Sequence, residues 1–112
     1  MKENFVKPPM DLATFEENAG EVAQLLKALS NKRRLMILCK LAEKGEMAVG
    51  ALVKEVGLSQ SALSQHLARL REEKMVTYRR EAQTLFYRIA DPRCARLMGA
   101  LYEIYCAKES EQ

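Results

Sequence analysis

Apolar residues recur in the first part of the chain at alternating steps of three and four positions. They are Leu12, Phe15, Ala19, Val22, Leu26 and Leu29. These steps keep the side chains on one face of an α-helix, and their alternation is the heptad spacing of a coiled-coil seam. The pattern predicts a long helix over residues 11–29. Such a seam packs inside a domain or against a second subunit, and we favour the second subunit.

The next segment predicts a buried helix. Ser30 and Asn31 are residue types that favour an N-cap. Residues 32–43 are apolar nearly all round after the first turn, and Gly45 suits the C-cap.

A short helix, a turn and a longer helix then follow in the order of a helix-turn-helix, which we predict over residues 49–73. Residues 49–56 form the short helix, Gly57 lies in the turn, and Ser59 is the expected N-cap of the longer helix. Leucines spaced by four and three mark the inner face of that longer helix. They are Leu63, Leu67 and Leu70.

The opposite face of the longer helix carries small and amide side chains. They are Gln60, Ser61, Ser64, Gln65 and Ala68, followed by Arg69. A helix face that is merely solvated would carry more Lys and Glu. Small hydroxyls let a backbone approach a groove, and a Gln amide pairs with an adenine edge. The pattern favours DNA recognition, with a bland polar face as the alternative.

Residues 75–90 change to the two-residue period of β-strands. The alternating apolar positions are Val76 and Tyr78 in one strand and Leu85, Tyr87 and Ile89 in the next. Between these strands we expect a basic strand end and a polar tip, over residues 79–83. A hairpin directly after a recognition helix predicts a winged helix. A two-stranded ribbon is marginally stable alone, so the wing must pack on the helices.

A final helix is expected over residues 91–107, with Asp91 as N-cap and Pro92 at its first position. It has two apolar stripes. The first comprises Cys94, Leu97, Met98, Leu101, Ile104 and Tyr105, and the second comprises Ala95, Gly99, Tyr102 and Cys106. One stripe can serve the core and the other a second subunit. The two terminal helices are therefore the expected dimer interface.

Length and charge agree with this organisation. A chain of 112 residues has room for one domain, residues 1–112, which we expect to be mainly α-helical, with about five helices and a two-stranded β wing. The net charge is +3. Residues 1–20 hold two basic and four acidic groups and residues 94–112 hold two and three, so the ends carry −3 and residues 21–93 carry +6. A basic centre between acidic ends suits nucleic-acid binding flanked by association elements, although a solvated surface would look similar.

Several classes of protein are disfavoured. The sequence has no apolar run near 18 residues and no signal-peptide pattern, so we expect a cytoplasmic protein without a membrane partner. Three cysteines make a disulfide-stapled secreted scaffold improbable. His66 is the single histidine, which disfavours a His-rich zinc site and a Ser-His-Asp enzyme. We expect no enzyme and no cofactor.

The cysteines restrict their own pairing. Cys94 and Cys106 lie twelve residues apart on the predicted last helix, a rise of about 18 Å. A disulfide needs Cα atoms within about 7 Å, so Cys39 must belong to any intramolecular disulfide while that helix is intact. The residues alone leave its partner open. Cys39 could equally be an inert apolar residue in a buried helix.

Three segments resemble the ArsR/SmtB family of bacterial winged-helix repressors. They read LLKALSNKRRLMILCKLAEK, VGALVKEVGLSQSALSQHLARLREEKMV and TLFYRIAD. The resemblance covers about residues 22–105, and its most specific motif is S-x-S-x-L-S-x-H-L at residues 59–67. The resemblance implies a homodimer that binds an inverted repeat in promoter DNA and responds to an inducer.

The resemblance also bears on the inducer. The C-V-C motif of arsenic sensors is missing from residues 46–52, and residues 91–105 hold none of the histidines of zinc and nickel sensors. A metal site needs three or four converging ligands, so we expect no metal at either usual site. The placement of Cys39 and Cys106 resembles the thiol-based subgroup, which includes sulfide-responsive regulators and a hemolysin activator. That subgroup implies a disulfide or polysulfide bridge between these two cysteines, formed with reactive sulfur or oxidants, which lowers DNA affinity.

The candidate DNA contacts divide by chemistry. Those expected nearest the bases are Gln60, Ser61, Ser64 and Gln65, and those expected at phosphates are Arg69, Arg79 and Arg80. Ser59 at the start of the helix and Gln83 at the wing tip are further candidate DNA contacts. For His66 three roles stay open: it caps a neighbouring group, it contacts a phosphate, or it only packs against the protein. One alternative is an ArsR-type regulator that binds DNA constitutively or responds to another inducer, and that acts as an anti-silencing activator. Two alternatives of other classes are a protein-interaction module and a small thiol enzyme.

Overall fold

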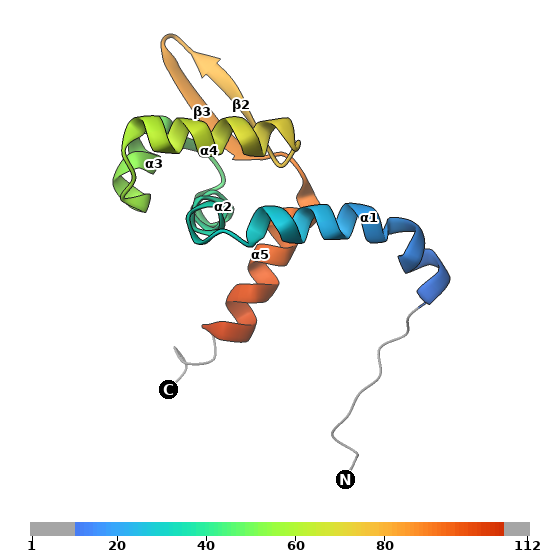
Figure 1. Cartoon of the computed structure of the whole chain (residues 1–112). Helices are drawn as coiled ribbons and strands as arrows, with labels where there is room; N and C mark the ends of the chain where they lie inside the picture. Colours follow the sequence, from blue (N-terminus) through green and yellow to red (C-terminus); the bar gives the residue numbers. More distant parts are fainter. Residues whose placement is uncertain (1–10, 107–112) are drawn as a thin grey trace.

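The computed structural model describes residues 11–106, which form five α-helices and three β-strands (Figure 1). In chain order the elements are α1 (Leu12–Leu29), α2 (Lys32–Lys44), β1 (Met47–Ala48), α3 (Val49–Val56), α4 (Gln60–Glu72), β2 (Val76–Glu81), β3 (Thr84–Ile89) and α5 (Pro92–Tyr105). Helices α2, α3 and α4 pack together, the β2–β3 hairpin projects beyond them, and α1 and α5 extend on the other side. This arrangement is a winged helix.

Local capping chemistry sets the helix boundaries as the sequence predicts. The side chain of Asn31 accepts hydrogen bonds from the first amides of α2, and Ser59 Oγ accepts one from Ala62 N at 3.1 Å. Gly45 and Gly57 end α2 and α3 with φ of 86° and 70°, backbone that favours glycine. Gly57 therefore makes the turn of the helix-turn-helix.

The sheet differs from the predicted two-stranded wing in two respects. A third strand, β1, pairs antiparallel with β3, through Met47 opposite Tyr87. A strand of two residues is too short to show a period of two in the sequence. The hairpin tip is also shorter than predicted, because residues 79–81 belong to β2 and only Ala82 and Gln83 lie between the strands.

The core lies between α2, α4, α5 and the base of the sheet. The three leucines predicted on the inner face of α4 are buried, as are Cys94 and Met98 of α5. The burial of the first stripe predicted on α5 changes along the helix. Its first four residues are buried or pack against the core, whereas Ile104 and Tyr105 are exposed because α5 continues beyond the core.

The terminal helices leave apolar side chains uncovered in the single chain. On α1 these are Leu12, Phe15 and Leu26, and on α5 they are Tyr102, Ile104 and Tyr105. Ala28 is the buried residue of α1. Half of the predicted heptad seam is therefore exposed within residues 11–106, whereas Ala19, Val22 and Leu29 are half-buried and Leu29 packs against the core. None of the described helices is long and apolar enough to cross a membrane.

Candidate nucleic-acid interface and thiol pair

The outer face of α4 presents the predicted recognition residues. Gln60, Ser61, Ser64, Gln65 and Arg69 are exposed, together with the cap residue Ser59. Ala68 and His66 are half-buried at the edges of this face. The leucine spacing predicted this orientation, because residues opposite the buried stripe of a helix must face solvent.

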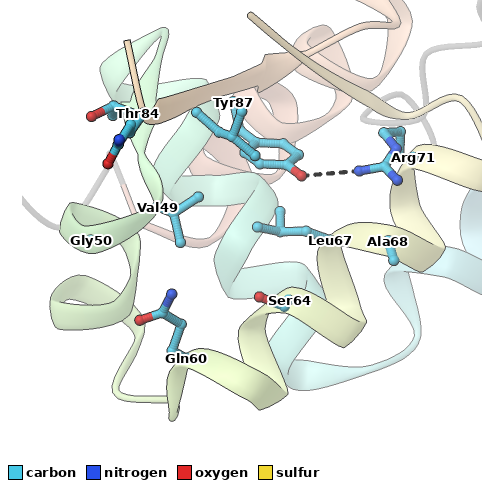
Figure 2. Close-up of a pocket in the computed structure, with 11 residues that line it drawn as sticks. Val49, Gly50, Gln60, Ser64, Leu67, Ala68, Arg71, Thr84 and Tyr87 are labelled. Carbon is cyan, nitrogen blue, oxygen red and sulfur yellow. Dashed lines mark hydrogen bonds between the residues drawn. The ribbon is translucent and has the colours of Figure 1, made fainter. Parts of the chain in front are cut away.

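A groove separates α4 from the wing. Its volume is about 550 Å³, and it is lined by Gly50 of α3, Gln60 and Ser64 of α4 and Gln83 and Thr84 of the wing, among others. Figure 2 shows Gln60 and Ser64 on one side of this hollow and Thr84 on the other. The fold thus brings the predicted tip residue Gln83 to the same groove as two predicted base-reading residues.

Arg71 joins α4 to the wing, and sequence reasoning did not single it out. Its Nη1 donates a hydrogen bond to the Tyr87 hydroxyl at 3.1 Å (Figure 2). Its guanidinium also lies 5.2 Å from the centre of the Tyr78 ring, a cation–π contact. Both partners lie on the strands beyond the turn, so no periodic signal in α4 could reveal them.

Arg79 and Arg80, both predicted to meet phosphates, lie in different environments. The two carboxylate oxygens of Glu46 accept hydrogen bonds from Arg79 at 2.9 and 3.1 Å. Glu81 also pairs with Arg79 at 3.2 Å, and the guanidinium lies over the Phe86 ring. The hydrogen bond from Arg79 holds the pKa of the Glu46 carboxyl below its usual value. Arg80 is exposed and belongs to none of the ion pairs seen among residues 11–106.

His66 lies close to three arginines. Burial first, and then the charges of Arg34, Arg69 and Arg33, hold the pKa of His66 below its ordinary value. Neutral histidine is therefore favoured there at neutral pH. The sequence pattern placed His66 and Arg69 on the same helix without linking them. It could not show that Arg33 and Arg34 act on His66, because they come from the first turn of α2.

The three cysteines are free and occupy three environments. Cys94 is completely buried, and burial, with a smaller effect of the Asp91 charge, raises its pKa to about 11. Cys39 is half-buried, and burial and then the Cys106 charge raise its pKa. Cys106 is exposed at the end of α5.

Cys39 opens onto a cavity between α2 and α5. The cavity has a volume of about 490 Å³, and its lining includes Met36, Cys39, Met98 and Tyr102. The Cys39 Sγ lies 3.9 Å from the Met98 Sδ. Cys106 lies one helical turn beyond Tyr102, and its amide donates to the Tyr102 carbonyl at 2.8 Å. Within residues 11–106, no three His, Cys, Asp or Glu side chains gather as metal ligands.

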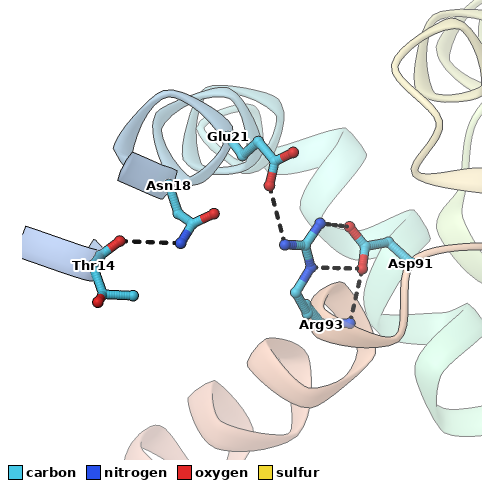
Figure 3. Close-up of polar contacts among 5 residues, drawn as sticks. All are labelled: Thr14, Asn18, Glu21, Asp91 and Arg93. Atoms are coloured by element: carbon cyan, nitrogen blue, oxygen red, sulfur yellow. Dashed lines mark hydrogen bonds and ion pairs between the residues drawn. The ribbon is translucent and has the colours of Figure 1, made fainter. Parts of the chain in front are cut away.

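An ion-pair network connects the terminal helices. Arg93 pairs with Glu21 of α1 at 3.1 Å and with Asp91 at 3.1 Å (Figure 3). Asp91 also caps α5, accepting a hydrogen bond from the Arg93 amide at 2.9 Å. This solvent-exposed pair links the start of α5 to the middle of α1, the two helices that expose apolar side chains.

Comparison with known proteins agrees with this geometry. Residues 31–78 match the family model described as bacterial regulatory protein, arsR family. The transcriptional activator HlyU of Vibrio cholerae serotype O1 is 46% identical over 98 residues, covering 88% of this chain and 90% of HlyU.

Solved structures are also similar. The transcriptional repressor BigR from Xylella fastidiosa superposes with a TM-score of 0.81 at 46% identity, covering 88% of this chain and 99% of BigR. A homodimeric winged helix-turn-helix DNA-binding domain from Mycobacterium bovis superposes with a TM-score of 0.71 at 32% identity, covering 96% of each chain. The chain therefore belongs to the arsR family of bacterial regulatory proteins, and it is a winged-helix DNA-binding transcriptional regulator, not an enzyme.

Proposed function

We propose that this regulator acts in the cytoplasm as a homodimer whose two α4 helices read an inverted repeat in promoter DNA, and that the Cys39/Cys106 pair switches its affinity. The observation that carries the DNA-reading part is the outer face of α4. It is exposed and almost uncharged up to Arg69, and it borders a groove shared with the wing.

The side chains on α4 suit the edges of base pairs in the major groove. Gln60 and Gln65 offer a donor and an acceptor together, and Ser61 and Ser64 permit close approach. Ser59, Arg69 and the wing would hold the phosphates on either side. On the wing, Arg80 is the stronger candidate because Glu46 and Glu81 already neutralise Arg79.

A homodimer fits the apolar side chains that the terminal helices leave exposed. Leu12, Phe15 and Leu26 of α1 and Tyr102, Ile104 and Tyr105 of α5 are all uncovered in the single chain. The related Mycobacterium bovis domain is itself homodimeric. Two helix-turn-helix units related by a twofold axis would meet two half-sites one helical turn apart, which is why an inverted repeat is the expected operator.

The cysteine pair would respond to reactive sulfur species or to oxidants. Cys39 lies at the α2–α5 cavity, and Cys106 is exposed one turn beyond a residue that lines it. Oxidation removes two protons and two electrons from the two thiols. A persulfide would accept these protons and electrons, and its S–S bond would break to give a thiol and hydrogen sulfide. Hydrogen peroxide would accept them instead and be reduced to water. Cys94 is completely buried and stays a spectator in this scheme.

A bond between Cys39 and Cys106 would couple the thiols to DNA binding through packing. It would tie α2 to the end of α5, while α2 also shares the core with α4. The separation of the two α4 helices in the dimer would then change. A coupling free energy of about 1–3 kcal/mol would lower DNA affinity by roughly 5- to 150-fold.

The direction of regulation depends on the operator position. BigR is a repressor and HlyU an activator, and this chain is 46% identical to each. We therefore propose repression when the operator overlaps the promoter. The second candidate, favoured by the similarity to HlyU, is an anti-silencing activator that binds DNA constitutively or with another inducer.

Gel shifts on the DNA upstream of the protein's own gene, with and without sodium polysulfide, test the switch. We expect the wild type to bind when reduced and to lose about tenfold or more of its affinity when treated. Cys39→Ser and Cys106→Ser should bind DNA whether treated or not. Cys94→Ala is the matched control and should respond as the wild type does. A Cys39→Ser variant that still responds would disprove the thiol pair, and absence of salt-sensitive duplex binding would favour a protein-interaction module.

A further inference from the structure

Three arginines and a histidine gather on the flank of α4 that faces away from the wing. With 3.6 residues per turn, His66 and Arg69 lie on one flank of α4, whereas Ser64 and Arg71 lie on the other, toward the wing groove. Arg33 and Arg34 come from the first turn of α2 and act electrostatically on His66. We call Arg33, Arg34, His66 and Arg69 the basic flank.

Within the described part of the chain, no carboxylate pairs with the arginines of the basic flank. By contrast Lys40, Arg79 and Arg93 each pair with two carboxylates in the same part of the chain.

The structure also holds the basic flank in place. The Asn31 side chain accepts hydrogen bonds from the Arg33 and Arg34 amides at 2.9 and 3.1 Å, which orders the start of α2. The Nε of Arg34 is buried without a hydrogen-bond partner in the described structure. Arg33 and Arg69 are exposed. The amino end of α2 adds the partial positive charge of the helix dipole at the same place.

Two acidic residues follow Arg69, Glu72 at the end of α4 and Glu73 at its C-cap. Neither forms an ion pair with the basic flank within residues 11–106, and Glu73 Oε1 is buried without a hydrogen-bond partner. The flank therefore presents two exposed guanidinium groups and a third, half-buried one, beside a histidine whose neutral form is favoured.

We propose that the basic flank binds backbone phosphates of the DNA that α4 reads, on the side of the helix opposite the wing. The inference rests on the proposed docking of α4 in the major groove. That groove is about 12 Å wide and an α-helix with its side chains fills it, so a strand of phosphates runs along each flank of the helix. The wing reaches one strand, and the basic flank lies where the other strand passes.

Duplex DNA fits this surface better than an acidic peptide does. The basic flank is continuous with the exposed, uncharged face of α4, so a ligand that occupies one borders the other. Guanidinium groups hold phosphate oxygens in a forked geometry. The arginines come from two helices, α2 and α4, and the charges of all three act on His66.

Salt dependence of duplex binding tests this inference. We choose Arg33→Ala/Arg69→Ala, because both side chains are exposed and the fold should survive. The probe is a mixed-sequence duplex followed by fluorescence anisotropy over a range of KCl concentrations. Each phosphate contact contributes about −0.9 to the slope of log K against log salt, so the slope should become shallower by about 2 for each chain of the variant.

The control variant Lys44→Ala/Arg96→Ala removes the same charge from exposed sites at the far end of α2 and on α5, and should keep the wild-type slope. Arg33→Lys/Arg69→Lys should largely restore the slope, because the charges return. A wild-type slope in the Arg33→Ala/Arg69→Ala variant would overturn the inference. A wild type that shows no salt-dependent binding would instead overturn the proposed function on which it rests.

Discussion

One residue type, cysteine, occupies three environments in this protein, and the environment determines what each thiol can do. Cys94 is enclosed by the core, Cys39 borders a cavity, and Cys106 is exposed. Sequence spacing excluded a bond between Cys94 and Cys106, but it could not rank Cys94 against Cys106 as the partner of Cys39. Burial depends on which elements pack together, and accessibility now favours Cys106.

We predict that Cys94 makes the free energy of unfolding depend on pH in the alkaline range. Its pKa rises from 9.0 to about 11 on folding, so the folded state binds the thiol proton more tightly than the unfolded state does. The resulting stabilisation is complete below pH 9.0 and is lost as the pH rises toward about 11. At about 1.4 kcal/mol for each pH unit, the loss is about 3 kcal/mol.

Urea unfolding of the reduced protein between pH 8 and 11 is the appropriate measurement. Cys94→Ala should be less stable at neutral pH, because it leaves a small cavity, and its free energy of unfolding should fall less steeply with pH. Ile37→Val is the control, since it also leaves a small cavity in the core but removes no thiol, and it should keep the wild-type slope. Equal slopes in Cys94→Ala and wild type would contradict this account.

The helices and strands show where local chemistry is decisive. Asn31, Ser59 and Asp91 cap the helices that the sequence predicts they cap. The sheet was predicted less well, because its third strand, β1, is too short for its period to be visible. Residues 79–81 are polar or charged and looked like a loop, although cross-strand pairing with β3 holds them in β2.

The wing should therefore bind DNA mainly through Arg80 and less through Arg79. Arg80 is exposed, whereas Glu46 and Glu81 neutralise Arg79 in the free protein. In the anisotropy assay, Arg80→Ala should reduce the salt slope by about 0.9 for each chain, and Arg79→Ala should reduce it clearly less. Equal reductions would mean that Arg79 leaves Glu46 when DNA binds.

For the molecule as a whole, the unpartnered faces of α1 and α5 are the main feature that a single chain leaves unexplained. Leu26 is 53% exposed and Ile104 is 68% exposed, on the two helices that the Arg93–Glu21 ion pair links. Burial of such side chains drives association. The heptad spacing of α1 already favoured a subunit contact, and the structure leaves Leu12, Phe15 and Leu26 of that seam exposed.

We accordingly predict that Leu26→Glu shifts the protein to a monomer in sedimentation equilibrium. An added charge on the seam must be desolvated on association, whereas the exposed site tolerates it in the single chain. Duplex affinity should fall at least about tenfold, because two linked half-sites become independent. Gln24→Glu adds the same charge to an exposed position outside the seam and should remain dimeric. A dimeric Leu26→Glu would place the subunit contact elsewhere.

The amino-acid sequence was enough to predict the five helices, the N-caps Asn31, Ser59 and Asp91, and the outward face of α4. Those features follow from periodicity and from contacts between residues a few positions apart. Only the tertiary structure decided that Glu46 binds Arg79, that Cys39 opens toward α5, and that Arg33 and Arg34 join His66. These partners lie more than thirty positions apart in the chain. Contacts at that separation depend on how elements pack, and they leave no periodic mark in a single sequence.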